Sequence, residues 1–368
     1  MNGLNLSNIQ DAKLGGTQVS AIYFGSNQIW ELDPYIYEYF CIECKQSGNM
    51  ELKVNGTLPD FSIQISRDKT SWETYTFDSS NKSYSFLSGN NRKYYIRATN
   101  SYYATSLDNY FNIKCTTGNF IVYGNIMSLI YGDNFAYNNT ISSTYVFNGL
   151  FMGSTNLSDA SNLKLPSLTL TSYCYANMFR DCTSLTAAPE LPATTLADRC
   201  YNYMFHSTSS LTTPPTLPAM TMQTYCYCYM FEGSGITSIN LPATTLADSC
   251  YANMLCYTKI TTLELPATSL SSYTRCYRTI CYGCTSLTSV NIKATTLTSQ
   301  CLNFAFYGCT NLNYIKAMFT TTPGTSYTGS WVYNVKSSGT FVKNSLATWN
   351  VTGNNGVPSG WTVQTASE

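Results

Sequence analysis

The sequence contains few charged residues. Only 11% of its 368 residues are Asp, Glu, Lys or Arg, and the 20 acidic residues balance the 20 basic ones. A neutral chain has no electrostatic attraction to polyanions, so we expect no nucleic-acid partner. The sequence also lacks an apolar run of about 18 residues, and we therefore expect no membrane insertion.

Histidine is almost absent, since His206 is the single one. Structural zinc sites take four ligands, and the two C-x-x-C pairs are poorly placed to supply them. Cys41 and Cys44 fall in an expected strand, where residues i and i+3 face opposite sides; Cys281 and Cys284 are two slots of a repeat. Because no Ser-His-Asp order or phosphate loop stands out either, we expect no metal, no cofactor and no catalytic residue, and predict a protein that is not an enzyme.

The first residues, MNGLNLSNIQDAKLGG, have neither the basic segment nor the apolar segment of a secretory signal. An exported protein needs such a signal, whereas a protein assembled in the cytoplasm does not, so the sequence favours a protein that is not secreted by this route.

What the sequence does have is an internal repeat. LPATTLADRCYNYMF begins at Leu191 and LPATTLADSCYANML begins at Leu241, and related copies surround them. A fixed period in the twenties predicts a solenoid, which we place over residues 119–317. The anchor prolines recur 24 or 26 residues apart: Pro166, Pro192, Pro218, Pro242 and Pro266.

One half of each repeat has the spacing L-x-x-L-x-L, which is that of a leucine-rich-repeat strand with alternate residues facing the core. It predicts strands over 236–241, 260–265, 287–292 and from Leu312. The two preceding copies contain Pro189, Pro214 and Pro215, so their strands should be short or bulged.

The other half, C-Y-x-x-M-F, should return the chain along the opposite wall, with equivalent residues stacked between rungs. The expected columns are Tyr175, Tyr201, Tyr227, Tyr251 and Tyr277; Met178, Met204, Met230 and Met254; and Phe179, Phe205 and Phe231.

Most of the 15 cysteines fall in repeat slots, some of which hold Ser or Thr in other copies. Residues that are small and interchangeable in this way indicate a packing position, so we predict reduced thiols rather than disulfides. One slot holds Cys174, Cys200, Cys226, Cys250 and Cys301; another holds Cys182, Cys284 and Cys309 beside Thr208, Ser234 and Thr258.

The units CYANMFRDCTSLTAAPELPATTLADRCYNYMF and FAFYGCTNLNYIKA resemble the BspA-type, or treponemal-type, leucine-rich repeats. The resemblance covers roughly the second half of the chain. These repeats occur in bacterial surface proteins and in virion fibre and structural proteins of phages of gut Bacteroides-type bacteria. The resemblance implies adhesion and protein–protein contact rather than catalysis.

The N-terminal part predicts two further units. In residues 1–34, two short apolar segments flank Gly25-Ser-Asn-Gln28, which predicts a hairpin. The pattern L-G-x-T-x-V-S-x-I-Y-x-G-x-x-x-I-W resembles an N-terminal segment of phage structural proteins and implies docking to other virion proteins; a small arm packed on the next domain is the alternative.

Residues 35–118 contain seven short strand candidates separated by turns, which favour an antiparallel β-sandwich.

Two segments flank the repeats. We expect residues 120–139 to cap the first rung, with Val146 and Phe151 in the slots of a degenerate first repeat. The period is lost over residues 318–368, where a C-terminal β cap should close the last rung. The predicted fold is therefore mainly β: an N-terminal arm, a sandwich, a leucine-rich-repeat solenoid and a cap.

The expected sheet of the solenoid presents one outward residue per rung, and these positions vary while the core positions repeat. They make a candidate binding face for a host-surface protein or a glycan; a solvated face without a ligand is the alternative. The candidate residues are Glu190, Thr216, Asn240, Glu264, Asn291 and Lys293.

These observations lead to one functional expectation: a phage virion protein, in a fibre, tail or head appendage, whose repeats bind a host receptor. A bacterial surface adhesin of the same repeat family and a purely architectural virion decoration protein are the alternatives. Virion fibres are commonly trimeric, but no heptad or collagen-like segment enforces a homo-oligomer here.

Overall fold

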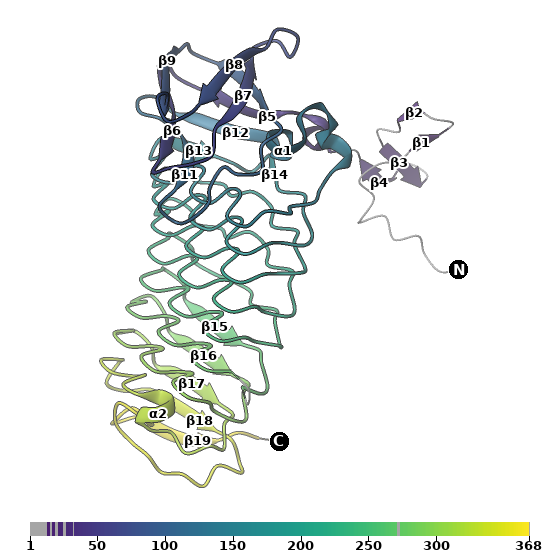
Figure 1. Ribbon diagram of the computed structural model, residues 1–368. Helices are drawn as coiled ribbons and strands as arrows, with labels where there is room; N and C mark the ends of the chain where they lie inside the picture. Colours follow the sequence, from purple (N-terminus) through teal and green to yellow (C-terminus); the bar gives the residue numbers. More distant parts are fainter. Residues whose placement is uncertain are drawn as a thin grey trace.

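The computed structural model describes residues 33–270 and 273–367, together with the backbone of four short strands before residue 33. The described chain is mainly β and forms an elongated stack, with antiparallel sheets at one end and a parallel sheet at the other (Figure 1). None of the described helices combines the length and the apolar character needed to cross a membrane.

The four early strands form two small antiparallel ladders. β1 (Lys13–Leu14) pairs with β2 (Thr17–Gln18), and β3 (Ala21–Phe24) pairs with β4 (Asn27–Glu31). The second ladder is the hairpin predicted around the Gly-Ser-Asn-Gln turn, which is thereby confirmed. The rest of the predicted docking arm up to residue 32 lies outside the described residues.

All seven strands predicted between residues 35 and 118 are present, in two antiparallel sheets. One sheet contains β5, β10, β7 and β8 in that order, and the other has the order β11-β6-β9. The alternating residues of these strands bury one face, where Phe61 lies 5.5 Å from Phe111. The strands are β5 (Phe40–Cys44), β6 (Gly48–Asn55), β7 (Phe61–Ser66), β8 (Glu73–Phe77), β9 (Ser83–Ser88), β10 (Arg92–Arg97) and β11 (Tyr110–Cys115).

Strand β12 (Phe120–Asn125) connects these sheets to the solenoid. It pairs antiparallel with β5 and parallel with β13 (Leu157–Asp159) and β14 (Leu163–Lys164). The sequence predicts only a cap over 120–139, but the first part of that segment is a sheet strand. The short helices α1 (Ser128–Tyr131) and η2 (Gly132–Tyr137) follow it, and η1 (Pro34–Tyr37) precedes β5.

One wall of the solenoid is built from turns that hydrogen-bond alternately within and between rungs. The Tyr175 and Asn177 amides donate to Cys200 and Asn202 of the next rung, whereas the Ala176 amide donates back to Tyr173. Every fourth residue of a wall segment adopts positive φ; in one rung these are Tyr173, Asn177 and Asp181, at 58°, 55° and 60°. Equivalent positive-φ residues of successive rungs form three columns on this wall; in this rung Tyr173 and Asp181 are partly exposed and Asn177 is buried.

The opposite wall carries parallel strands in its later rungs. The prediction is confirmed for the later parts of the spans 260–265, 287–292 and from Leu312, where the strands begin two residues after the predicted start and the inward residues are buried. It is wrong over 236–241, where no regular strand forms. The preceding rung contains Pro214 and Pro215, which have no N–H to donate to a ladder. The strands are β15 (Thr262–Leu265), β16 (Ser289–Ile292), β17 (Tyr314–Ala317), β18 (Thr340–Lys343) and β19 (Thr362–Thr365).

The predicted internal columns are confirmed. Successive rings of the Tyr175 column lie 5.7 to 5.9 Å apart and nearly parallel. Those of the Phe179 column lie 5.4 to 5.5 Å apart and are extended to the first rung by Phe151, as expected for the degenerate repeat. The methionines of the third column are fully buried. No single rung could bury these groups, so the stacking produces the core.

The solenoid does not end where the sequence period is lost. β18 and β19 continue the parallel sheet beyond residue 317, and Trp331 lies 5.9 Å from Phe306. The backbone amide of Phe306 donates to Trp331, as in earlier rungs. The segment expected to cap the solenoid thus adds short strands that pair with the last rungs, and Trp331 follows Phe306 in the same column. All four residues of β19 are exposed.

Candidate functional site

The predicted binding-face residues are all at least partly exposed, but the structure brings only some of them together. Glu264 in β15 is opposite Asn291 in β16, and the Lys293 Nζ lies 2.5 Å from the Glu264 Oε1. This hydrogen bond to Lys293 holds the pKa of Glu264 below its usual value. Glu190, Thr216 and Asn240 lie exposed in rungs without a regular strand.

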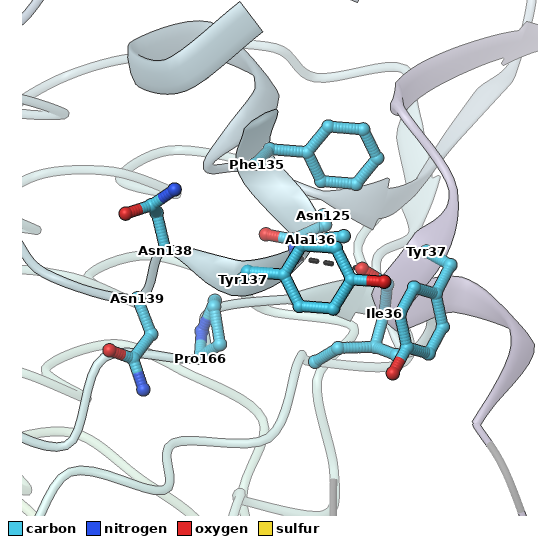
Figure 2. Close-up of a pocket in the computed structure, with 9 residues that line it drawn as sticks. All are labelled: Ile36, Tyr37, Asn125, Phe135, Ala136, Tyr137, Asn138, Asn139 and Pro166. Atoms are coloured by element: carbon cyan, nitrogen blue, oxygen red, sulfur yellow. Dashed lines mark hydrogen bonds between the residues drawn. The ribbon is translucent and has the colours of Figure 1, made fainter. Parts of the chain in front are cut away.

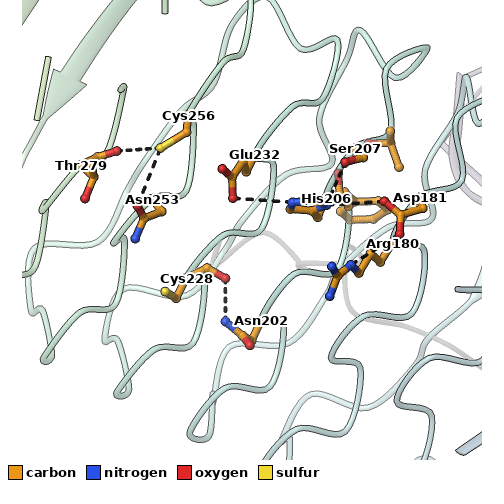
Figure 3. Close-up of polar contacts among 12 residues, drawn as sticks. Arg180, Asp181, Asn202, His206, Ser207, Cys228, Glu232, Asn253, Cys256 and Thr279 are labelled. Carbon is orange, nitrogen blue, oxygen red and sulfur yellow. Dashed lines mark hydrogen bonds and ion pairs between the residues drawn. The ribbon is translucent and has the colours of Figure 1, made fainter. Parts of the chain in front are cut away.

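A second group of polar side chains lies on the turn wall, where the sequence predicted no site. Arg180, His206 and Glu232 occupy equivalent positions in consecutive rungs, so rung stacking places them side by side (Figure 3). The His206 Nδ1 lies 3.7 Å from Asp181, and its Nε2 lies 3.6 Å from Glu232. The Ser207 hydroxyl is 2.9 Å from the same Nδ1.

His206 is only partly exposed, with 20% of its side chain accessible. The packed column around it removes water from the imidazole. Burial, followed by the positive charge of Arg180, lowers the pKa of His206, and the neighbouring Asp181 only partly opposes this shift. Burial likewise raises the pKa of Glu232. The ring is therefore held in its neutral form near pH 7.

These residues have part of the arrangement that nucleophilic catalysis requires. A hydroxyl within hydrogen-bond reach of an imidazole, with a carboxylate orienting the far side of the ring, is the general pattern. Here the Ser207–His206 distance fits that pattern, but the 3.6 Å separation from Glu232 exceeds a hydrogen bond. The sequence places Arg180, His206 and Glu232 at equivalent positions of consecutive rungs, but only the structure shows that His206 reaches Glu232.

A small cavity lies where the antiparallel sheets meet the first rung (Figure 2). Its volume is ≈ 200 Å³, which is below the range of about 300 to 1,000 Å³ usual for ligand pockets. The buried Asn125 closes one side by donating to the Ile36 carbonyl at 2.9 Å. The lining residues are Ile36, Tyr37, Asn125, Phe135, Ala136, Tyr137, Asn138, Asn139 and Pro166.

All 15 cysteines are buried free thiols, in agreement with the predicted packing slots. The structure adds Cys276 to the Cys174 column. Burial raises the pKa of Cys174 to about 12, whereas a hydrogen bond to Cys115 lowers the pKa of Cys44. Over residues 33–270 and 273–367, no group of three or more His, Cys, Asp or Glu side chains is arranged to hold a metal ion.

Comparison with known proteins gives no relative. No family model matches the chain, and no curated protein or solved structure matches it either.

Proposed function

We propose that this protein is a non-enzymatic phage virion component whose solenoid binds a receptor or glycan on the host surface. The observation that carries the proposal is the contrast between the two sets of positions in each rung. Core positions repeat as Cys, Tyr, Met and Phe, whereas exposed positions one rung apart differ in charge and size. A rigid repeated scaffold with varied outward residues is how solenoid proteins build binding surfaces.

The proposal includes a finer description of the fold. We assign the solenoid to the BspA-type leucine-rich repeats, supported by the buried Leu263 and Leu265 of β15 and the exposed Glu264 between them. We assign residues 35–118 to an antiparallel β-sandwich, supported by the core that its two sheets share. Residues 1–34 would dock to other virion proteins.

The non-enzymatic part rests on the imperfect geometry around His206 and on the thiols, nearly all of which burial makes poorly reactive. Hydrolysis of an ester or a glycoside by the purified protein, lost in Ser207→Ala, would contradict it.

Binding of labelled full-length protein to intact host cells tests the proposal. The full chain is needed, because a cut between 118 and 119 would separate β12 from β5. We expect the triple variant Glu264→Ala, Asn291→Ala, Lys293→Ala to bind less, and the control pair Lys53→Ala, Glu73→Ala, on exposed residues of the antiparallel sheets, to bind normally.

Two other outcomes would favour the alternatives. Failure to bind cells, together with capture of capsid or tail proteins, would indicate an architectural decoration protein. Cell binding by a protein whose gene lies among secretion genes, far from capsid and tail genes, would indicate a bacterial surface adhesin.

A further inference from the structure

A stack of aromatic rings and one guanidinium group runs along the turn wall, outside the predicted binding face. Tyr145 and Tyr173 stack at 4.3 Å. The Arg199 guanidinium follows, 5.4 Å from the Tyr173 ring and 4.4 Å from the Tyr225 ring. These four residues occupy one positive-φ column in four consecutive rungs. Because the backbone fixes the direction of each side chain, Arg199 is clamped between two rings.

The guanidinium group of Arg199 has no acceptor among the described residues, in either a hydrogen bond or an ion pair. Two other arginines on this wall are engaged: Arg180 pairs with Asp181, and the Arg275 Nε donates to Gln300 at 2.9 Å. Arg199 is partly exposed, as are Tyr173 and Tyr225. Rings cover the faces of the guanidinium, so its N–H groups are held in one plane at the surface.

A planar fork of N–H donors matches a carboxylate, which it can bind through two parallel hydrogen bonds. Stacking also reduces the side-chain entropy that binding must overcome, since both rings already restrict the guanidinium. Among the described residues no carboxylate forms an ion pair with Arg199, so its charge remains available to an anionic ligand.

The surroundings indicate which carboxylate. Tyr203 and Tyr229 stack at 4.4 Å in the neighbouring column of the same rungs. Arg199 therefore lies among four partly exposed tyrosines, whose rings offer apolar edges and whose hydroxyls offer hydrogen bonds. This mixture suits a sugar better than a peptide side chain, since a sugar presents both C–H groups and hydroxyls.

We infer that Arg199, Tyr173 and Tyr225 form a binding site for a saccharide that carries a carboxylate. The inference rests on the proposed function, since it names the ligand class that the solenoid would recognise on a host surface. It adds a candidate binding site on the turn wall to the candidate face on the parallel sheet.

Calorimetric titration of the full-length protein with oligogalacturonate tests the inference, with its methyl ester as the uncharged probe. We expect binding of the acid but not of the ester. Arg199→Gln and Arg199→Lys should each weaken binding about tenfold or more, because both remove the planar fork. The matched control is Arg275→Gln, which makes the same charge change at the same slot three rungs away and should bind normally.

Each other outcome overturns the inference or a named part of it. Unchanged affinity in a folded Arg199→Gln protein would remove the site. If inorganic sulfate competed for Arg199 as well as the saccharide binds, the saccharide class would be wrong and a simple oxyanion site would remain. Cell binding without oligogalacturonate binding would overturn the inference but keep the proposed function. Oligogalacturonate binding without cell binding would keep the saccharide site but overturn the proposed function.

Discussion

At the residue scale, the column of buried tyrosines combines a stacking advantage with a polar cost. Tyr175, Tyr227 and Tyr251 lie inside the solenoid, and their hydroxyl oxygens have no hydrogen-bond partner. An unsatisfied buried hydroxyl costs about 1 to 3 kcal/mol. Stacked rings between successive rungs contribute about 0.5 to 1.5 kcal/mol per pair. The phenyl ring rather than the hydroxyl therefore accounts for the stabilisation that each tyrosine provides.

Replacing Tyr251 with Phe should raise the free energy of unfolding by about 1 kcal/mol, because it removes an unpaired polar atom and keeps the ring. Denaturant unfolding measures this change. The control is Tyr103→Phe, whose hydroxyl donates to the Leu129 carbonyl at 2.9 Å and which should lower stability by about the same amount. A loss of stability in Tyr251→Phe similar to that in the control would contradict the prediction.

His206 should make stability depend on pH. Its pKa is lower in the folded chain than its ordinary value of 6.5, so the unfolded chain takes up the proton first as the pH falls. The contribution of neutral His206 to the free energy of unfolding should be fully present above about pH 7. It should decrease as the pH falls from there toward the folded-state pKa. His206→Gln should lack this component. Equal slopes of unfolding free energy against pH in the two proteins would show that the cluster in Figure 3 does not perturb the imidazole.

At the element scale, β12 is where the antiparallel end and the solenoid become one structure. Gly124 has φ of 80°, and a Cβ placed there would lie 2.1 Å from the Tyr39 carbonyl oxygen. Only glycine allows this close approach, since both the conformation and the space exclude a side chain. The Gly124 amide meanwhile donates to Asn162 at 3.0 Å, on the solenoid side.

Gly124→Ala should therefore destabilise the protein by more than about 1 kcal/mol, from left-handed strain together with the backbone clash. Gly324→Ala is the control, because its φ of 172° is extended and nothing lies within 4 Å of the added Cβ. Thermal unfolding of both variants compares them. Equal melting temperatures would mean that β12 can shift away from Tyr39 at little cost.

At the scale of the whole molecule, one continuous core runs from Phe40 to Trp361. The stability of one part of this core is nevertheless coupled only to that of adjacent parts, because each rung contacts only its neighbours. Phe151 belongs to the first rung and lies 6.0 Å from Phe40 of the antiparallel sheet. A defect at this junction should therefore affect both adjacent parts of the molecule while leaving the distant end intact.

Phe151→Ala should cost about 3 to 5 kcal/mol locally. We expect faster amide hydrogen exchange in β5, β12 and the first rungs, and unchanged exchange in β16 and β17. Mass spectrometry of exchanged peptides measures both regions in one experiment, and Phe306→Ala provides the reciprocal control at the far end. Uniformly faster exchange along the chain would indicate that the solenoid unfolds as a single unit.

The sequence by itself determined the period, the internal columns and the burial of the cysteines, because these depend on residue types that recur in register. It also located the seven early strands through alternation and turns. The tertiary structure alone decided which exposed residues meet. Arg199 reaches Tyr173 and Tyr225, and His206 reaches Glu232, only through rung stacking, which joins residues about two dozen positions apart. The continuation of the solenoid past residue 317 likewise depends on side-chain volume and on backbone pairing between strands. Trp331 fills a core position there that the repeated sequence pattern does not identify.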